Sequence, residues 1–166
     1  MSSNRGKDFE GVIKDCILQV PDVDVQRLYD STNGFVGVRQ PSDYIVYKFP
    51  YQYYVECKST NSHTLHKDYL TQLDDLAKKR HVKGVVAGFI IWYIKDDVTV
   101  FIPVETAMQH FYNRCMKSIS VKDILNGSMK ESGYYLVLEG RKKRVFFDYD
   151  FKYFFKEIEA WQKQRL

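Results

Sequence analysis

Residues 85–94 limit the possible folds of this chain more than any other segment. They form an uninterrupted β-branched and aromatic run, which is typical of a strand buried on both faces. The run is about half the length of a membrane-spanning helix, so it does not indicate a transmembrane segment. A turn at Asp96-Asp97 predicts that residues 98–104 form a strand pairing back onto it. The segment therefore favours an α/β protein with a covered sheet.

Helical and strand patterns alternate along the rest of the chain, without a repeat, a low-complexity tract or a linker. We therefore expect a single domain over residues 1–166, with a core at about residues 4–104 and a C-terminal hairpin and helix at 134–166 that complete it. The expected architecture is a central mixed sheet flanked by helices. Helices are expected at residues 5–20, 67–81, 105–116 and 151–164, with one further turn at 121–125, and strands at 25–29, 44–48 and 51–58, with a hairpin of 134–139 and 145–149.

The composition, 45% hydrophobic and 28% charged, is that of a soluble globular protein. The formal net charge of +4 is compatible with an acidic polymer as partner. Cys16, Cys57 and Cys115 are far apart and odd in number, which argues against a disulfide framework or a thiolate zinc site. The polar start of the chain carries no secretory signal, and there is no GxxxxGK phosphate loop. We expect a cytoplasmic protein without a membrane partner or a small-molecule cofactor.

The most informative motif is Pro41-Ser42-Asp43 followed, after twelve residues, by Glu56-Cys57-Lys58. Side chains alternate along a strand, so Glu56 and Lys58 point to one face and Cys57 to the other. If the hairpin turns about Phe49-Pro50, paired residue numbers sum to 99, and Asp43 lies opposite Glu56. Opposed side chains have Cβ atoms ~5 Å apart. The pattern therefore predicts two facing carboxylates with an amine beside them.

Facing carboxylates repel each other but suit a hard divalent cation such as Mg²⁺. The backbone carbonyl of Cys57 can add a third oxygen ligand beside Asp43 and Glu56. A bound cation lowers the pKa of its water, and the Lys58 ammonium can neutralise charge on a scissile phosphate. These residue types in this pattern indicate phosphodiester hydrolysis.

Two further polar residues lie on helix faces that are expected to pack against the sheet. Glu10 is beside the apolar stripe of the first helix, where it can bind a second cation or hold a metal-bound water. Gln72 is placed by its spacing from Tyr69 and Leu76 on the packed side of the second helix, where a buried amide needs partners. For both residues a purely structural role is the alternative.

These residues resemble the PD-(D/E)xK nuclease superfamily, whose two half-motifs are matched by Pro41-Ser42-Asp43 and Glu56-Cys57-Lys58. The opening segment, residues 4–10, more narrowly resembles the RecU-type Holliday junction resolvases of Gram-positive bacteria and their phages. The resemblance covers residues 4 to about 104 and implies a restriction-endonuclease-like core. It also implies a homodimer that binds four-way DNA junctions and nicks two strands symmetrically with Mg²⁺ or Mn²⁺, and a stalk at residues 33–40. By motif position, the catalytic set comprises Glu10, Asp43, Glu56, Lys58 and Gln72.

Three functions remain open at this point: a junction resolvase, a restriction or repair nuclease acting on duplex DNA, and a catalytically silent DNA-binding module. If the protein is a nuclease, the basic residues that flank the motifs are expected to contact DNA phosphates. For each of these residues, an ordinary solvated surface position is the alternative. Tyr51 to Tyr54 favour core packing over base stacking, and His63 and His66 lack a second pair for zinc. The candidate DNA contacts are Arg5, Lys7, Arg39, Lys67, Lys78, Lys79, Arg80, Arg141, Lys142, Lys143 and Arg144.

Overall fold

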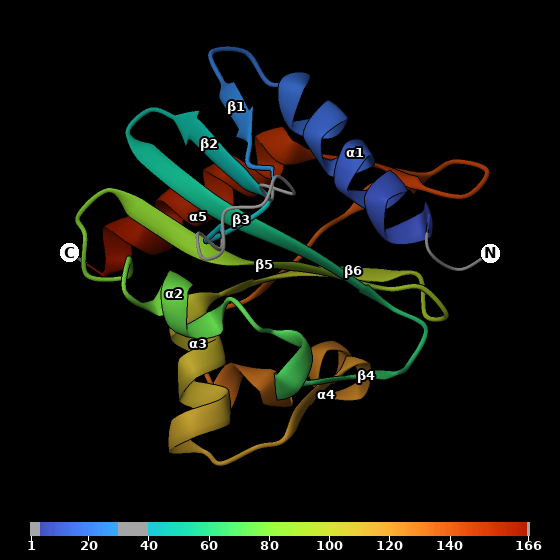
Figure 1. Cartoon of the computed structure of the whole chain (residues 1–166), viewed down its shortest axis with the longest axis vertical. Helices are drawn as coiled ribbons and strands as arrows, with labels where there is room; N and C mark the ends of the chain where they lie inside the picture. Colours follow the sequence, from blue (N-terminus) through green and yellow to red (C-terminus); the bar gives the residue numbers. More distant parts are fainter. Residues whose placement is uncertain (1–3, 30–39, 166) are drawn as a thin grey trace, which may run out of the picture.

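The computed structural model describes residues 4–29 and 40–165. Its centre is a six-stranded sheet in the order β1-β2-β3-β5-β6-β8 (Figure 1). Strands β3 and β5 are parallel, and the other neighbouring pairs are antiparallel, so the sheet is mixed. The strands are β1 (Asp24–Arg27), β2 (Tyr44–Lys48), β3 (Tyr51–Thr60), β5 (Val85–Tyr93), β6 (Val98–Pro103) and β8 (Leu136–Val137).

Strand β5 is the buried centre of the sheet, as its composition predicts: every residue from 86 to 93 is buried. Alternate side chains enter two different apolar clusters. Val86, Ile90 and Trp92 pack on one face, whereas Phe89 and Tyr93 pack on the other. Burying both faces of this strand helps to hold the two layers of helices onto the sheet.

Helices cover both faces of the sheet, which confirms the predicted fold class. The two long helices, α1 (Asn4–Leu18) and α5 (Phe151–Gln164), pack on one face through residues such as Ile13 and Phe154. Three short helices lie on the opposite side in Figure 1. They are α2 (Leu73–Ala77), α3 (Val104–Met108), which continues into the π-helical turn η2 (Gln109–Asn113), and α4 (Val121–Leu125).

The second and third predicted helices are shorter than expected. The segment predicted as 67–81 consists of a 3-10 turn η1 (Lys67–Tyr69) and the five residues of α2. Leu70 is buried whereas Tyr69 is 66% exposed, so the apolar anchor differs from the one that the helical spacing indicates. The third predicted helix ends at Asn113, and Cys115 has a positive φ of 54°, a conformation that a right-handed helix cannot contain.

Two small sheets were not predicted in this form. Strand β4 (Thr64–His66) pairs with β7 (Ser118–Ser120). The predicted C-terminal hairpin divides: β8 joins β6, while β9 (Gly140–Lys142) pairs with β10 (Phe147–Tyr149). A 3-10 turn η3 (Ser128–Glu131) lies between α4 and β8. Within residues 4–29 and 40–165, none of the helices has the length and apolar character needed to cross a lipid bilayer.

Candidate active site

The β2–β3 hairpin brings the two motif halves together with the predicted register. Tyr44 pairs with Val55 and Lys48 with Tyr51, so paired numbers sum to 99 as expected. Asp43 directly precedes β2, where this register places it opposite Glu56. Its carboxylate Oδ2 accepts a hydrogen bond from the backbone N–H of Cys57 at 2.7 Å. Just before β2 begins, the side chain of Asp43 therefore accepts a β3 backbone hydrogen bond in place of a β2 backbone carbonyl.

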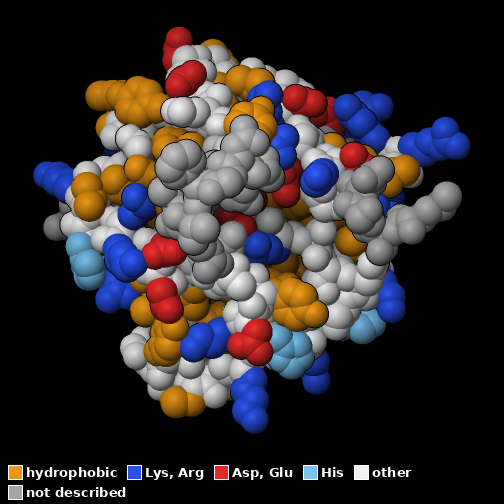
Figure 2. Space-filling view, in the orientation of Figure 1, with side chains coloured by type: hydrophobic (Ala, Val, Ile, Leu, Met, Phe, Trp, Pro, Cys, Tyr) orange, Lys and Arg blue, Asp and Glu red, His pale blue; other side chains and the backbone are white. Residues whose placement is uncertain are grey.

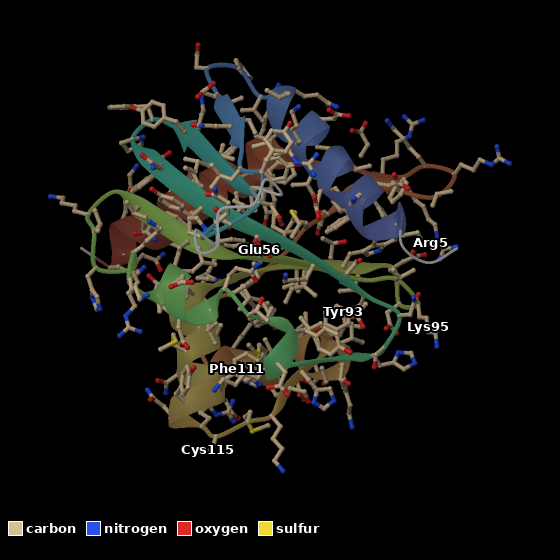
Figure 3. All side chains as sticks on the ribbon, in the orientation of Figure 1. Arg5, Glu56, Tyr93, Lys95, Phe111 and Cys115 are labelled. Carbon is tan, nitrogen blue, oxygen red and sulfur yellow. The ribbon has the colours of Figure 1, made fainter. Side chains whose placement is uncertain are left out.

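Glu56 and Lys58 share one face of β3 and are in direct contact. The Lys58 Nζ atom donates to Glu56 Oε1 at 2.6 Å. Glu56 is only 2% exposed and is labelled near the middle of the sheet in Figure 3. Cys57 points the other way, into the cluster covered by α1 and α5. A buried carboxylate is unfavourable for folding even when a cation contacts it, which points to a functional reason for this arrangement.

Burial and mutual repulsion raise the pKa of the acids at this site. Burial, followed by the charge of Asp43, raises the pKa of Glu56 to about 7, against the lowering effect of Lys58. Burial also raises the pKa of Asp43, although the Cys57 N–H and Lys58 oppose the increase. The pKa of Glu10 is raised by burial and then by Asp43. The three carboxylates are therefore close enough to repel one another, and a bound cation would offset this repulsion.

Glu10 reaches this group from α1 and is held by a partner that the sequence did not reveal. Arg27 Nη2 donates to Glu10 Oε2 at 2.9 Å. Arg27 is the last residue of β1 and pairs with Tyr44 in the sheet, next to Asp43. The Tyr44 hydroxyl in turn donates to the backbone carbonyl of Glu10 at 3.1 Å. The available signal was the place of Arg27 in a strand that pairs with the start of β2.

The oxygen atoms at this site fit a hard divalent cation. In the part of the chain that the structure describes, no group of three His, Cys, Asp or Glu side chains is gathered as a metal cage. Mg²⁺ does not require one, because it binds through one or two carboxylates and keeps several waters. The N–H and C=O of one strand residue point to the same side, so the Cys57 carbonyl faces Asp43 as its N–H does. Asp43, Glu56 and this carbonyl are the residues that can hold the ion.

Gln72 does not occupy the buried position that was predicted for it. It is half-exposed at the residue before α2, and its side-chain Oε1 accepts a hydrogen bond from the Thr71 hydroxyl at 2.9 Å. The expectation of a buried amide in need of partners is wrong, because α2 begins only at Leu73 and Gln72 lies outside its packed face. A catalytic role for Gln72 loses that support.

The basic residues are dispersed among acidic and apolar side chains, as Figure 2 shows for one face. Several have partners within the chain. Lys78 pairs with Asp75 at 2.7 Å, and the Lys79 ammonium lies 4.2 Å from the centre of the Tyr54 ring. The ammonium of Lys67 is 3.7 Å from the Tyr112 ring centre, Arg80 donates to His81, and Lys142 pairs with Asp97. Arg5 and Lys7 are exposed at the start of α1.

The Arg141–Arg144 run extends from β9 into the following turn, instead of lying only at a hairpin tip. Arg39 and all but the last residue of the expected stalk at 33–40 lie outside the described residues. The predicted DNA contacts therefore remain predictions.

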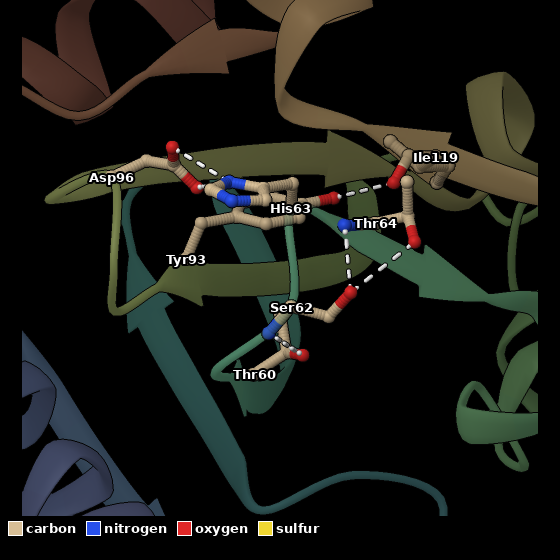
Figure 4. Close-up of polar contacts among 7 residues, drawn as sticks. All are labelled: Thr60, Ser62, His63, Thr64, Tyr93, Asp96 and Ile119. Atoms are coloured by element: carbon tan, nitrogen blue, oxygen red, sulfur yellow. Dashed lines mark hydrogen bonds and ion pairs between the residues drawn. The ribbon is translucent and has the colours of Figure 1, made fainter.

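The tyrosine and histidine candidates contribute to the structure of the fold. Tyr51 and Tyr53 are buried in the core. His63 Nδ1 lies 2.9 Å from the carboxylate of Asp96 and links the loop after β3 to the β5–β6 turn (Figure 4). Nearby, the buried Tyr93 donates to the backbone carbonyl of Ile119 at 3.0 Å. This cluster joins the small β4–β7 sheet to the main sheet.

Fold and site together define an α/β protein with a buried, acid-rich site on a β-hairpin. No protein-family model matches the chain, and no curated protein matches it. Among solved structures it resembles Hjc from Archaeoglobus fulgidus, a Holliday junction resolvase from an archaeal hyperthermophile. The TM-score is 0.43 at 17% identity, covering 71% of this chain and 85% of that chain. A similarity this low does not identify a function, and no comparison supports the narrower resemblance to the RecU-type enzymes.

Proposed function

We propose that this chain is a divalent-cation-dependent endonuclease that hydrolyses phosphodiester bonds in DNA. The observation that carries the proposal is the Asp43–Glu56–Lys58 arrangement. Two carboxylates face each other across the hairpin register, and the Lys58 ammonium contacts one of them at 2.6 Å. The two carboxylates can bind a cation, and the neighbouring ammonium can bind an anion. Together they match the charges of a metal-bound phosphate.

Each residue of the proposed site has a defined task. A bound Mg²⁺ would supply an activated water and offset charge on the phosphate. Asp43 and Glu56 would hold and orient the ion, and the backbone N–H of Cys57 positions one Asp43 oxygen through a hydrogen bond of 2.7 Å. Lys58 can donate to Glu56 or to an anion in front of it, so it neutralises charge that develops on the phosphate. Glu10, held by Arg27, is the third carboxylate of the site.

The narrower proposal is resolution of four-way DNA junctions by a homodimer in the cytoplasm, with Mn²⁺ as a substitute for Mg²⁺. It is supported by the resemblance of residues 4–10 and of the two half-motifs, and by the basic residues at the start of α1. Symmetric nicking needs two active sites on one junction, which is the reason for proposing a dimer.

Incubation with a synthetic four-way junction and with a linear duplex, with and without Mg²⁺, tests both levels of the proposal. Paired symmetric nicks in the junction alone support resolution, whereas cleavage of both substrates indicates a duplex nuclease. Binding without cleavage of either would contradict the nuclease proposal and indicate a silent DNA-binding module. Asp43→Asn is expected to abolish cleavage. The control is Asp22→Asn, at an exposed residue with a φ of 55°, a conformation that Asn tolerates well.

A further inference from the structure

A second site candidate lies at the start of β3, whereas Glu56 is near the middle of that strand. It is a cavity of about 580 Å³ between the turn that follows α2, the start of β3 and β5, and the end of α5. Figure 1 shows the end of α5 (red) beside the segment that leads into β5. Tyr51 lines the cavity and Glu56 is five residues further along β3, so the two sites are separated by roughly 17 Å. The residues of the proposed active site do not line it.

The charged side chains that line the cavity are basic. Arg80, His81, Lys83 and Arg165 line it, and its lining contains no Asp or Glu among the residues that the structure describes. Arg165 is also paired with Glu105 at 2.8 Å, which leaves part of its guanidinium for another anion. Lys83 and His81 are exposed and can turn toward a ligand. This arrangement is complementary to a phosphate or another compact anion.

The rest of the lining is apolar and well supported. Pro50, Tyr51, Val82 and Val85 provide carbon surface, and Val82 is 55% exposed. The turn is held in place because Gln52 N–H donates to the Gly84 carbonyl at 2.8 Å. Gly84 has a φ of 80°, which disfavours any residue with a side chain at this position. The wall of the cavity is therefore formed before a ligand arrives.

Gln162 adds an adaptable polar group from α5. It lines the cavity, and its buried Nε2 has no hydrogen-bond partner among the described residues. The amide can therefore turn toward a ligand without losing a bond to the protein. A buried amide donor without a partner is uncommon in folded proteins, so this nitrogen is available to a ligand acceptor.

We propose that this cavity binds a nucleoside 5′-monophosphate unit. The base packs on the apolar surface around Val82 and Val85, and the phosphate meets the cations led by Lys83. The volume lies within the ~300–1,000 Å³ typical of small-ligand sites. The same chemical unit can come as a free nucleotide or as the 5′-phosphorylated end of a DNA strand. The proposal concerns binding only and does not require the nuclease activity.

Calorimetric titration with deoxyadenosine 5′-monophosphate, in EDTA to prevent cleavage, tests the proposal. We expect binding that weakens by about tenfold in Lys83→Glu, because an attractive charge is replaced by a repulsive one. Lys95→Glu makes the same charge change at an exposed turn residue, labelled at the far side of Figure 3, and is expected to bind as the wild type. Deoxyadenosine and inorganic phosphate are each expected to bind more weakly than the nucleotide.

Oligonucleotides with and without a 5′-phosphate distinguish the two sources. If only the phosphorylated strand binds in a way that Lys83→Glu weakens, the unit comes from DNA. The proposal is overturned if Lys83→Glu changes neither titration, or if inorganic phosphate binds as tightly as the nucleotide. Glu56→Gln is expected to leave nucleotide binding in the cavity unchanged. A loss of DNA cleavage and a loss of nucleotide binding can therefore be told apart.

Discussion

Replacing Glu56 with Gln is expected to stabilise the cation-free protein at neutral and alkaline pH, although the residue is 2% exposed and paired with Lys58. The reason is the raised pKa of the carboxyl group, about 7 in the folded chain against an ordinary 4.5. Gln has nearly the same shape and carries no charge at any pH. It therefore removes the cost of ionising a buried acid beside Asp43.

The sign follows from proton binding. Well below pH 4.5 Glu56 is protonated in both the folded and the unfolded chain, so its titration contributes no stability difference between wild type and Glu56→Gln. Between 4.5 and about 7 the folded chain holds the proton more tightly, so stability falls as pH rises, and the loss is complete above pH 7. Because a tenfold change in a protonation equilibrium corresponds to about 1.4 kcal/mol, the loss in wild type amounts to about 3 kcal/mol.

Urea unfolding in EDTA at pH values from 4 to 8 measures this difference. The stability of Glu56→Gln relative to wild type should increase by about 3 kcal/mol across the range, or about 6–12 °C in Tm for a chain of this size. Glu131→Gln, at a carboxylate that is 67% exposed and paired with Arg114, should show no comparable trend. A pH-independent difference between wild type and Glu56→Gln would show that folding does not raise the pKa of Glu56.

Three further substitutions test the roles of Lys58, Arg27 and Gly88. Lys58→Ala should abolish DNA cleavage while a gel-shift assay shows near-normal binding; retained turnover would exclude Lys58 from catalysis. Arg27→Ala should raise the pKa of Glu10 in an NMR titration, because the guanidinium lowers it, and an unchanged value would show that the ion pair is weak in solution. Gly88→Ala places a Cβ atom 2.7 Å from the Ile102 carbonyl and the Phe101 ring, so urea unfolding should show a loss of about 1–3 kcal/mol. Gly11→Ala, which meets nothing within 4 Å, should show no loss.

The parts of the fold that the sequence predicts depend on strong local signals. Strand β5 is a continuous apolar run, and the β2–β3 register follows from a short turn at Phe49-Pro50 and strict alternation. Those two features are sufficient to place Asp43 opposite Glu56 and to turn Cys57 into the core. The central part of the candidate site was therefore predictable from fewer than twenty residues of sequence.

The remaining features depend on contacts between distant segments, for which no local pattern exists. Strands β4 and β7 have three residues each and are more than fifty residues apart, so neither shows a strand pattern alone. Tyr69 and Leu70 are equally acceptable apolar anchors by spacing, and only packing under β5 selects Leu70. The Arg27–Glu10 ion pair joins a strand to a helix, which the sequence does not encode as a motif.

Anomalous scattering from crystals soaked in Mn²⁺ would show whether Asp43 and Glu56 bind a cation, because it locates the ion without requiring turnover. We expect one strong peak between the carboxylates of Asp43 and Glu56, at about 2.1 Å from their oxygens and near the Cys57 carbonyl. In Asp43→Asn crystals the same peak should weaken or vanish. A peak elsewhere in the molecule, with Glu56 still bound to Lys58, would contradict the proposed cation site.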